Sequence, residues 1–337
     1  MNWKKLGTTL LAGLMATALL TGCDKGGTST GDPGQSSGQP SAQTPAPPPP
    51  QRSIDGAEIK FGGKKGHLYA LKVSKKDGLN LFNDPVFMQD AVYLHGDADK
   101  DSDEGKYCLL RIALQGDKLS APEIIAESRG VGRLATNGKA VFFASNRPGE
   151  KDKGLAYDGK ELTVLDKDWF ENTVGITGSD ELLNVAGLDY DVRIATRSGD
   201  KMDYKDVFKL PTDKGQGYAL VYADAEGFYF SVTYDDKHAL LVTDPTGREI
   251  RTIPGWKDDE FGSWAVTQNY IVMFGKSEYN EKSDQDNVCP FRIFDRATGK
   301  EVGDASAANF APGQAVQMSG NSLIAFDGED TFYIIDL

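Results

Sequence analysis

The feature that most constrains this chain is a series of short, β-rich runs separated by tight-turn residues, clearest in Val131–Lys167. That stretch contains four runs rich in β-branched and aromatic residues, and glycine lies between most of them, as in Asn137-Gly138 and Asp158-Gly159. Such runs are typical of antiparallel strands joined by tight turns. One four-stranded sheet of this size cannot bury both faces, so the pattern predicts further copies stacked beside it.

The rest of the chain supplies such copies. The second run of each copy is the easiest to align, and it recurs as AVYLHG from Ala91, AVFFAS from Ala140, ELLNVAG from Glu181, GFYFSVT from Gly227, YIVMFGK from Tyr270 and SLIAFDG from Ser322. Successive copies are about 46 residues apart, which is a typical length for a propeller blade. We therefore expect an all-β fold, a β-propeller of four-stranded blades over residues 54–337, with a stacked pair of β-sandwiches as the alternative.

A turn motif also recurs between the third and fourth runs of several copies. It has an Asp followed by Gly and then Lys or Arg with Glu, as in Tyr157–Glu161, Thr243–Glu249 and Phe294–Glu301. This pattern resembles bacterial propellers built from WD-like and quinoprotein-like repeats. No Trp-Asp dipeptide is present, so the resemblance implies the architecture and not a subfamily.

The last copy ends the chain with TFYIIDL and has three runs where the others have four. A ring of blades must close or leave a sheet edge exposed. The residues before Ala91 contain runs to spare, so we predict that Leu68–Val73 or Leu79–Phe82 completes the last blade. This closure gives six blades. If the N-terminal runs form a blade of their own, the number is seven.

The first 22 residues have the features of a secretory signal. Lys4 and Lys5 precede an apolar run of about 15 residues, whereas a membrane-spanning helix needs about 20. Leu20-Thr21-Gly22-Cys23 then resembles the bacterial lipobox. The resemblance implies cleavage before Cys23, a diacylglycerol on its sulfur and an acyl chain such as palmitate on its amine. An ordinary signal peptide followed by a chance cysteine is the alternative.

Residues 23–53 form the predicted linker, which is rich in Gly, Ser and Pro and has no aromatic residue. We expect disorder there, because such a composition cannot form a core. Asp24 resembles an inner-membrane retention signal. The predicted location is therefore the bacterial cell envelope, on the periplasmic face of the inner membrane, with the outer membrane as the alternative. The lipid anchor is the expected contact with the membrane.

The charge of the chain bears on its partners. The formal net charge is −13, and it becomes −15 when Lys4 and Lys5 leave with the signal segment. A strongly negative surface repels phosphate backbones and anionic headgroups, so we expect no nucleic-acid partner. It also favours solubility, and we expect a monomer. Cys108 and Cys289 fall on the third strands of non-neighbouring blades, which predicts two separately buried thiols.

Reaction motifs are scarce. The predicted folded region, residues 54–337, has no G-x-S-x-G elbow, and the chain has no H-E-x-x-H sequence, so we predict no catalytic residue. His95 and His238 are expected to be isolated on the surface, and the alternative is that the two imidazoles meet on one face of the propeller. One acidic loop has alternating carboxylates that suit Ca²⁺, and its candidate ligands are Asp97, Asp99, Asp101 and Asp103. A solvated acidic hairpin without metal is the alternative, and no other cofactor is expected.

Aromatic residues in the predicted interblade loops suggest a binding face. These loops should share one face of a propeller, and aromatic rings are favoured anchors in interfaces. The candidates are Trp169, Phe170, Trp256, Phe261 and Phe310. The alternative is that these rings pack between blades as part of the core.

Together these features predict a non-catalytic binding or scaffold lipoprotein of the cell envelope. Its ligand would be an envelope protein, a peptide or a small molecule. The alternative is a propeller-fold envelope hydrolase or lyase, lactonase-like or glycan-active, with a metal in its central channel. Fold class alone does not decide between these functions.

Overall fold

The structure is a computed structural model. It describes residues 52–74, 78–82, 84–98, 106–127, 133–145, 153–167, 172–187, 189–212, 217–234, 237–257, 261–276, 278–280, 285–308, 310 and 314–337. Every regular element among these residues is a β-strand. Within the same residues, no helix has the length and apolarity needed to cross a bilayer.

The first sheets along the chain are antiparallel, and each sheet is named here by its innermost strand. The β4 sheet contains β4 (Val86–Met88), β5 (Ala91–Asp97), β6 (Tyr107–Gln115) and β8 (Glu123–Glu127), with short β3 (Asn80–Leu81) and β7 (Lys118–Leu119) at its edges. The β9 sheet contains β9 (Ala135–Thr136), β10 (Val141–Ser145), β11 (Lys153–Tyr157) and β12 (Leu162–Leu165). The β13 sheet contains β13 (Thr173–Thr177), β14 (Leu182–Ala186), β15 (Asp191–Ser198) and β16 (Lys201–Lys209).

The second half of the chain repeats this order. The β17 sheet contains β17 (Gly217–Asp224), β18 (Phe228–Tyr234), β19 (Lys237–Thr243) and β20 (Glu249–Lys257). A short parallel pairing of β13 with β17 joins the β13 and β17 sheets into one eight-stranded sheet. The β21 sheet contains β21 (Phe261–Val266), β22 (Tyr270–Gly275), β24 (Gln285–Asp295) and β25 (Glu301–Ala308), with β23 (Glu278–Asn280) paired to β24. The β26 sheet contains β26 (Ala315–Ser319), β27 (Ser322–Phe326) and β28 (Thr331–Asp336), and then β2 (Lys64–Lys72) and β1 (Ala57–Phe61) from the N-terminal side.

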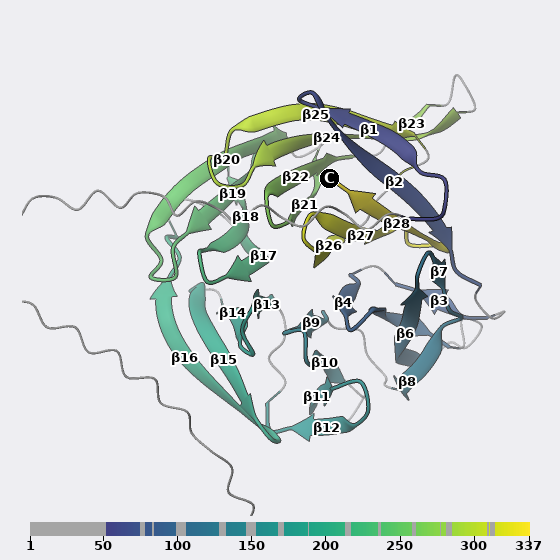
Figure 1. Ribbon diagram of the computed structural model, residues 1–337. Coiled ribbons are helices and arrows are strands. Elements are labelled where there is room, and N and C mark those ends of the chain that lie inside the picture. The colour runs from purple at the N-terminus through teal and green to yellow at the C-terminus, as the bar shows by residue number, and fades with distance from the viewer. Residues whose placement is uncertain are drawn as a thin grey trace, which may run out of the picture. The chain divides into compact units, whose positions relative to one another are not determined.

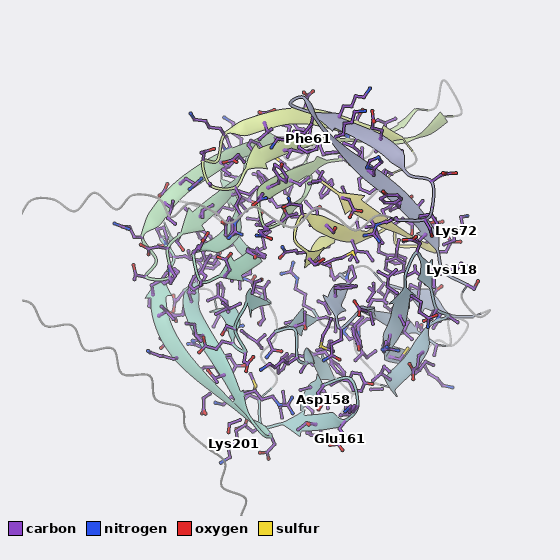
Figure 2. All side chains as sticks on the ribbon, viewed as in Figure 1. Phe61, Lys72, Lys118, Asp158, Glu161 and Lys201 are labelled. Carbon is purple, nitrogen blue, oxygen red and sulfur yellow. The ribbon has the colours of Figure 1, made fainter. Side chains whose placement is uncertain are left out.

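The β9 sheet has the strands and turns that the sequence predicts for Val131–Lys167. Gly138 and Gly159 have φ of 80° and 94°, a backbone region that glycine enters without strain. The N–H groups of Lys160 and Glu161 donate to Asp158 Oδ1 at 2.9 and 2.8 Å, and these bonds lower the pKa of Asp158. Figure 2 shows Asp158 and Glu161 close together at this turn. Side-chain capping of the turn by Asp explains why the motif recurs.

The sheets have a propeller-like, all-β arrangement around a common centre (Figure 1). Each innermost strand contacts the next, from β4 through β9, β13, β17 and β21 to β26, and β26 contacts β4. The core lies between successive sheets. For example, Phe142 of β10 packs in one cluster with Ala195 of β15, and Val92 of β5 packs in another with Ile334 of β28. Each sheet is therefore buried on both faces by its neighbours.

The N-terminal residues close the arrangement as expected. Strand β2 pairs antiparallel with β28, in a register from His67–Asp336 to Lys72–Thr331. This result confirms the prediction for Leu68–Val73, whereas β3, within the other predicted stretch, pairs with β5. Strand β1 adds outside β2. Figure 2 labels Phe61 and Lys72 at the ends of β1 and β2.

A buried ion cluster reinforces this closure. Arg52 Nε donates to Asp336 Oδ2 at 2.8 Å, and its Nη1 lies 3.7 Å from Asp117 Oδ1 in the β6–β7 turn. The Arg52 and Asp336 side chains are only 6% and 2% exposed. Ser322 also donates to Asp336, at 2.5 Å. Arg52, which the sequence places in the linker, thus joins three segments that are far apart along the chain.

The two cysteines of the folded region are separate buried thiols, as predicted. Cys108 lies on β6 and Cys289 on β24, and no disulfide joins them. The Cys108 thiol donates to the Gly96 carbonyl at 3.5 Å, and the Cys289 thiol donates to the Gly275 carbonyl at 3.3 Å. Burial raises the pKa of the Cys289 thiol to about 12, so this thiol is unreactive at neutral pH.

Candidate functional site

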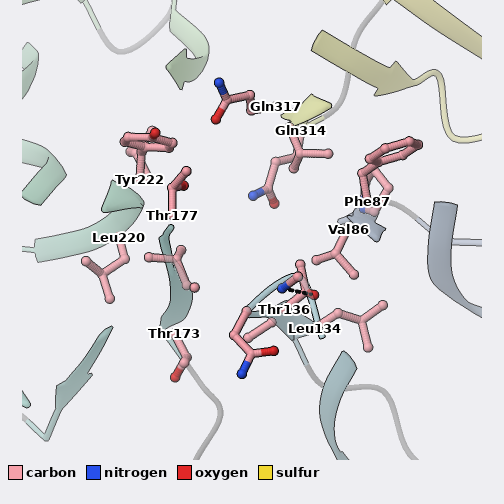
Figure 3. A pocket seen from close by; sticks show the side chains of 18 of the residues that line it. Val86, Phe87, Leu134, Thr136, Thr173, Thr177, Leu220, Tyr222, Gln314 and Gln317 are labelled. Atoms are coloured by element: carbon pink, nitrogen blue, oxygen red, sulfur yellow. Dashed lines mark hydrogen bonds between the residues drawn. The ribbon is translucent and has the colours of Figure 1, made fainter. Parts of the chain in front are cut away.

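A cavity of about 260 Å³ lies where the innermost strands meet. Its walls come from β4, β9, β13, β17, β21 and β26, so residues from across the whole chain converge on it. Gly175 of β13 permits the close approach of β9, because a Cβ atom there would lie 1.8 Å from the Thr136 carbonyl oxygen. Figure 3 shows this cavity at close range.

The cavity is lined mainly by small, apolar and uncharged polar side chains. The uncharged polar groups on its wall include Thr136, Thr177, Tyr222, Gln314 and Gln317. In Figure 3, Gln314 and Gln317 extend from β26 and the residue before it, across from Thr177 and Tyr222. Amide and hydroxyl groups can both donate and accept hydrogen bonds. The wall can therefore bind a ligand rich in uncharged polar groups.

Charged groups are few on this wall. Among its described residues only Asp84 and Arg133 carry charge, and each precedes an inner strand, β4 and β9 respectively. The same described lining has no histidine and no cysteine. General acid–base chemistry usually needs titratable groups in hydrogen-bonding reach of one another, and this wall does not bring such a set together.

Tyr222 is positioned by a buried ion pair at the junction of the β17 and β21 sheets. Arg296 pairs with Asp224 and donates to Tyr229 Oη at 2.8 Å. The guanidinium carbon of Arg296 lies 5.1 Å from the centre of the Tyr222 ring, a cation–π contact. The Tyr222 hydroxyl donates to Asp224 at 3.4 Å. These contacts fix the Tyr222 ring on the cavity wall.

We expect Tyr222 to make the protein sensitive to alkali. Burial raises the pKa of Tyr222 from 10.0 to about 12, so the folded state retains the phenolic proton at a pH where the unfolded chain loses it. The free energy of unfolding should then fall by roughly 2 to 3 kcal/mol between pH 10 and pH 12 through this residue. Urea unfolding at pH 8 to 11.5 should show a shallower fall for Tyr222→Phe than for the wild type. If the free energy of unfolding fell equally steeply with pH in both proteins, this role of Tyr222 would be contradicted.

The structure changes the picture of the predicted aromatic face. Phe310 is fully buried, with its ring centre 4.9 Å from that of Tyr333, so it belongs to the core and cannot contact a partner. Trp256 and Phe261 are half-buried and pack against the core between the β17 and β21 sheets. Trp169 and Phe170 lie outside the described residues.

The predicted calcium loop is only partly described. Asp97 is 9% exposed and accepts a hydrogen bond from the Lys106 N–H at 2.8 Å, so it caps its own hairpin. Asp99, Asp101 and Asp103 lie outside the described residues. Within the described part of the chain, no three His, Cys, Asp or Glu side chains are grouped closely enough to hold a metal.

The histidine expectation also needs correction. His95 is 3% exposed, and its ring packs edge-on against Phe143. His238 stacks on Phe261 with ring centres 4.0 Å apart. Neither ring is isolated on the surface, because both lie on strands whose inward faces are covered by the neighbouring sheet.

Sequence reasoning missed the residues that line the cavity. They lie on the first, irregular run of each copy, which is too short and too mixed in polarity to attract attention as a strand. The available signal was the recurrence of Thr or Gln within those runs, such as Thr136, Thr177 and Gln317. Their common place in the first run of successive copies could have identified them as neighbours in a ring of sheets.

Comparison with known proteins does not assign this chain to a family. No protein-family model and no curated protein matches the sequence. The solved structures that resemble it are β-propeller or WD40-like proteins. A putative TolB from Agrobacterium tumefaciens is 12% identical, with a TM-score of 0.40 over 76% of this chain and 90% of that one. YCF48 bound to D1 peptide is 10% identical, with a TM-score of 0.42 over 79% and 96%. The WD40 domain of SCAP from fission yeast is 11% identical, with a TM-score of 0.36 over 77% and 71%.

Proposed function

We propose that this protein is a lipid-anchored binding module of the bacterial cell envelope, without catalytic activity, whose ligand site is the central cavity. The observation that carries the proposal is the wall itself, where amide and hydroxyl side chains from separate sheets converge on one hollow. A concave site with a few convergent polar groups is the usual form of a ligand pocket. Its uncharged polar groups suit hydrogen-bonded recognition of a peptide or a small polar molecule.

Six blades are part of the same proposal. The support is the cyclic series of contacts among the innermost strands, together with the pairing of β2 to β28, which leaves the N-terminal strands in the last sheet. The lipid anchor at Cys23 is proposed from the lipobox-like residues that precede it. An acylated cysteine followed by a linker would tether the binding module at the membrane surface.

Substitution of the two cavity glutamines should test the binding site. Gln314→Ala with Gln317→Ala removes two amide groups from the wall, and we expect at least a tenfold loss of the ligand that co-purifies with the full chain from detergent-treated native envelopes. Quantitative mass spectrometry would measure both captured proteins and small molecules. The loss reflects unmatched polar groups on the ligand, each of which costs about 1 to 3 kcal/mol when buried.

The matched control is Gln115→Ala, which removes an exposed amide at the end of β6. This variant should capture as much ligand as the wild type, and all three proteins should unfold at the same temperature. Equal capture by the double variant and the wild type would contradict the assignment of the central cavity as the ligand site.

A further inference from the structure

A second hollow, of about 660 Å³, opens beside the central cavity between the β4 and β26 sheets. It is called the closure cleft here, because Arg52 and Asp117 of the ion cluster at the chain closure lie on its wall. Phe87, Gly138 and Met318 line both hollows. The two spaces are therefore neighbours that share a wall.

The closure cleft lies at one particular end of the inner strands. Gln89 and Asp90 on its wall follow β4, and Ser319 is the last residue of β26. Asp84, on the wall of the central cavity, precedes β4. The two hollows together therefore extend from the beginning of β4 past its end, which makes an elongated site suited to a linear ligand.

Three non-glycine residues beside β4 have positive φ. Gln89 and Asp90 have φ of 50° and 57°, and Asp84 has φ of 74°. Gln89 and Asp90 lie between the paired residues Met88 and Ala91, so they form the two-residue hairpin turn that joins β4 to β5. Such a turn takes positive φ at both central positions. The tight turn holds Asp90 on the wall of the closure cleft.

The wall of the closure cleft combines apolar and acidic groups. Phe87, Leu114 and Met318 are half-buried on it. Arg52 is already paired with Asp336 and Asp117. Asp90 is exposed and forms no ion pair with any described residue. With a chain of net charge −13 around it, the cleft should attract cations.

We infer that the closure cleft is the second half of the ligand site and that the ligand is an extended peptide. The inference rests on the proposed function. The peptide backbone lies along the amides and hydroxyls of the central cavity, which can pair with main-chain N–H and C=O groups of any sequence. An apolar side chain of the peptide packs on Phe87 and Met318, and an adjacent Lys or Arg pairs with Asp90. Charge complementarity of this kind gives specificity.

A library of 12-residue peptides displayed on phage tests this inference on the full mature chain in detergent. Selected peptides should be enriched in an apolar residue next to Lys or Arg. Two variants then test the cleft with one enriched synthetic peptide. Asp90→Asn keeps the shape and tolerates positive φ, and it should weaken binding about fivefold. Ser319→Trp fills the cleft, and it should weaken binding more than tenfold.

Matched controls place the same changes elsewhere. Asp206→Asn on β16 and Ser198→Trp at the end of β15 alter positions remote from both hollows, and they should bind the peptide like the wild type. If the two cavity glutamine changes weaken binding and the two cleft changes do not, the cleft inference is overturned and the proposed function stands. If neither pair weakens binding, both are overturned.

One further variant tests whether the closure cleft binds a partner peptide or a segment of the chain itself. Pro47–Pro50 precede Arg52 closely, so this segment could compete for the closure cleft. Replacing these four prolines with serine preserves length, and an unchanged affinity for the enriched peptide is the expected result. A gain of tenfold or more would mean that the chain's own segment is the occupant, which would overturn a partner peptide as the ligand of the cleft.

Discussion

A chain without residues 54–82 is expected to lose the cooperative thermal transition of the intact protein. The deletion removes β1, β2 and β3, and β28 then becomes an exposed edge. It also removes buried apolar side chains, among them Phe61, Leu68 and Leu71, that fill the core on both faces of the β26 sheet. Each such side chain contributes about 1.5 to 3 kcal/mol, so the loss is comparable with the whole stability of a typical domain, about 5 to 15 kcal/mol.

The ion cluster adds to this effect. With the N-terminal strands absent, nothing positions Arg52 beside Asp336, whose side chain is 2% exposed. Removing one partner of a buried ion pair typically costs about 3 to 5 kcal/mol, because the other charge is left uncompensated. The single substitution Arg52→Ala should therefore lower the melting temperature clearly, although the sheets themselves remain complete.

Circular dichroism during heating would measure both variants. The control is a deletion of residues 25–43 from the predicted linker, which should leave the melting temperature unchanged. A synthetic peptide of residues 52–74, added to the truncated chain, should restore part of the transition, since it carries β1, β2 and Arg52. A truncated protein that melts as sharply and as high as the intact one would refute the closure by β2 and β28.

The closure of the fold could be predicted from sequence because it follows from the number of β-rich runs in the last copy and before Ala91. The last copy has three runs, the N-terminal side has runs to spare, and a ring must close or leave a sheet edge exposed. These facts predicted that an N-terminal strand completes the last sheet, and they left Leu68–Val73 and Leu79–Phe82 as the two candidates. The Arg52–Asp336 contact was not accessible in this way. The two residues are 284 positions apart, and nothing in the composition around Arg52 distinguishes it from the linker that precedes it.

The proposed binding site was harder to predict for a different reason. Aromatic residues between strands can serve a surface or a core, and sequence does not distinguish the two at Phe310. The structure buries this ring against Tyr333 and Phe274. The cavity residues Gln314 and Gln317 are ordinary polar residues in a short run, and only the convergence of separate sheets gives them a common function.

Replacing the signal segment should change the location of the protein completely. If residues 1–23 are exchanged for a cleavable secretory leader without a lipobox, we expect the mature protein in the soluble envelope fraction and none in the membrane pellet. The wild type should pellet with membranes. Several acyl chains contribute about 0.8 kcal/mol per buried CH₂ group, which gives stable anchoring. The acidic mature surface, at −15, offers no electrostatic attraction to anionic lipids that could replace the anchor.

The substitution Cys23→Ala needs a chemical readout, because an uncleaved apolar run could itself retain the protein at the membrane. Labelling with radioactive palmitate should give a signal for the wild type and none for Cys23→Ala. Cys108→Ala and Cys289→Ala should keep the label, since both thiols are buried in the core and cannot accept a lipid. Asp24→Ser should also keep the label while moving the protein from the inner to the outer membrane. If the Cys23→Ala variant were still labelled with palmitate, another residue would carry the lipid, and this result would refute the lipobox assignment.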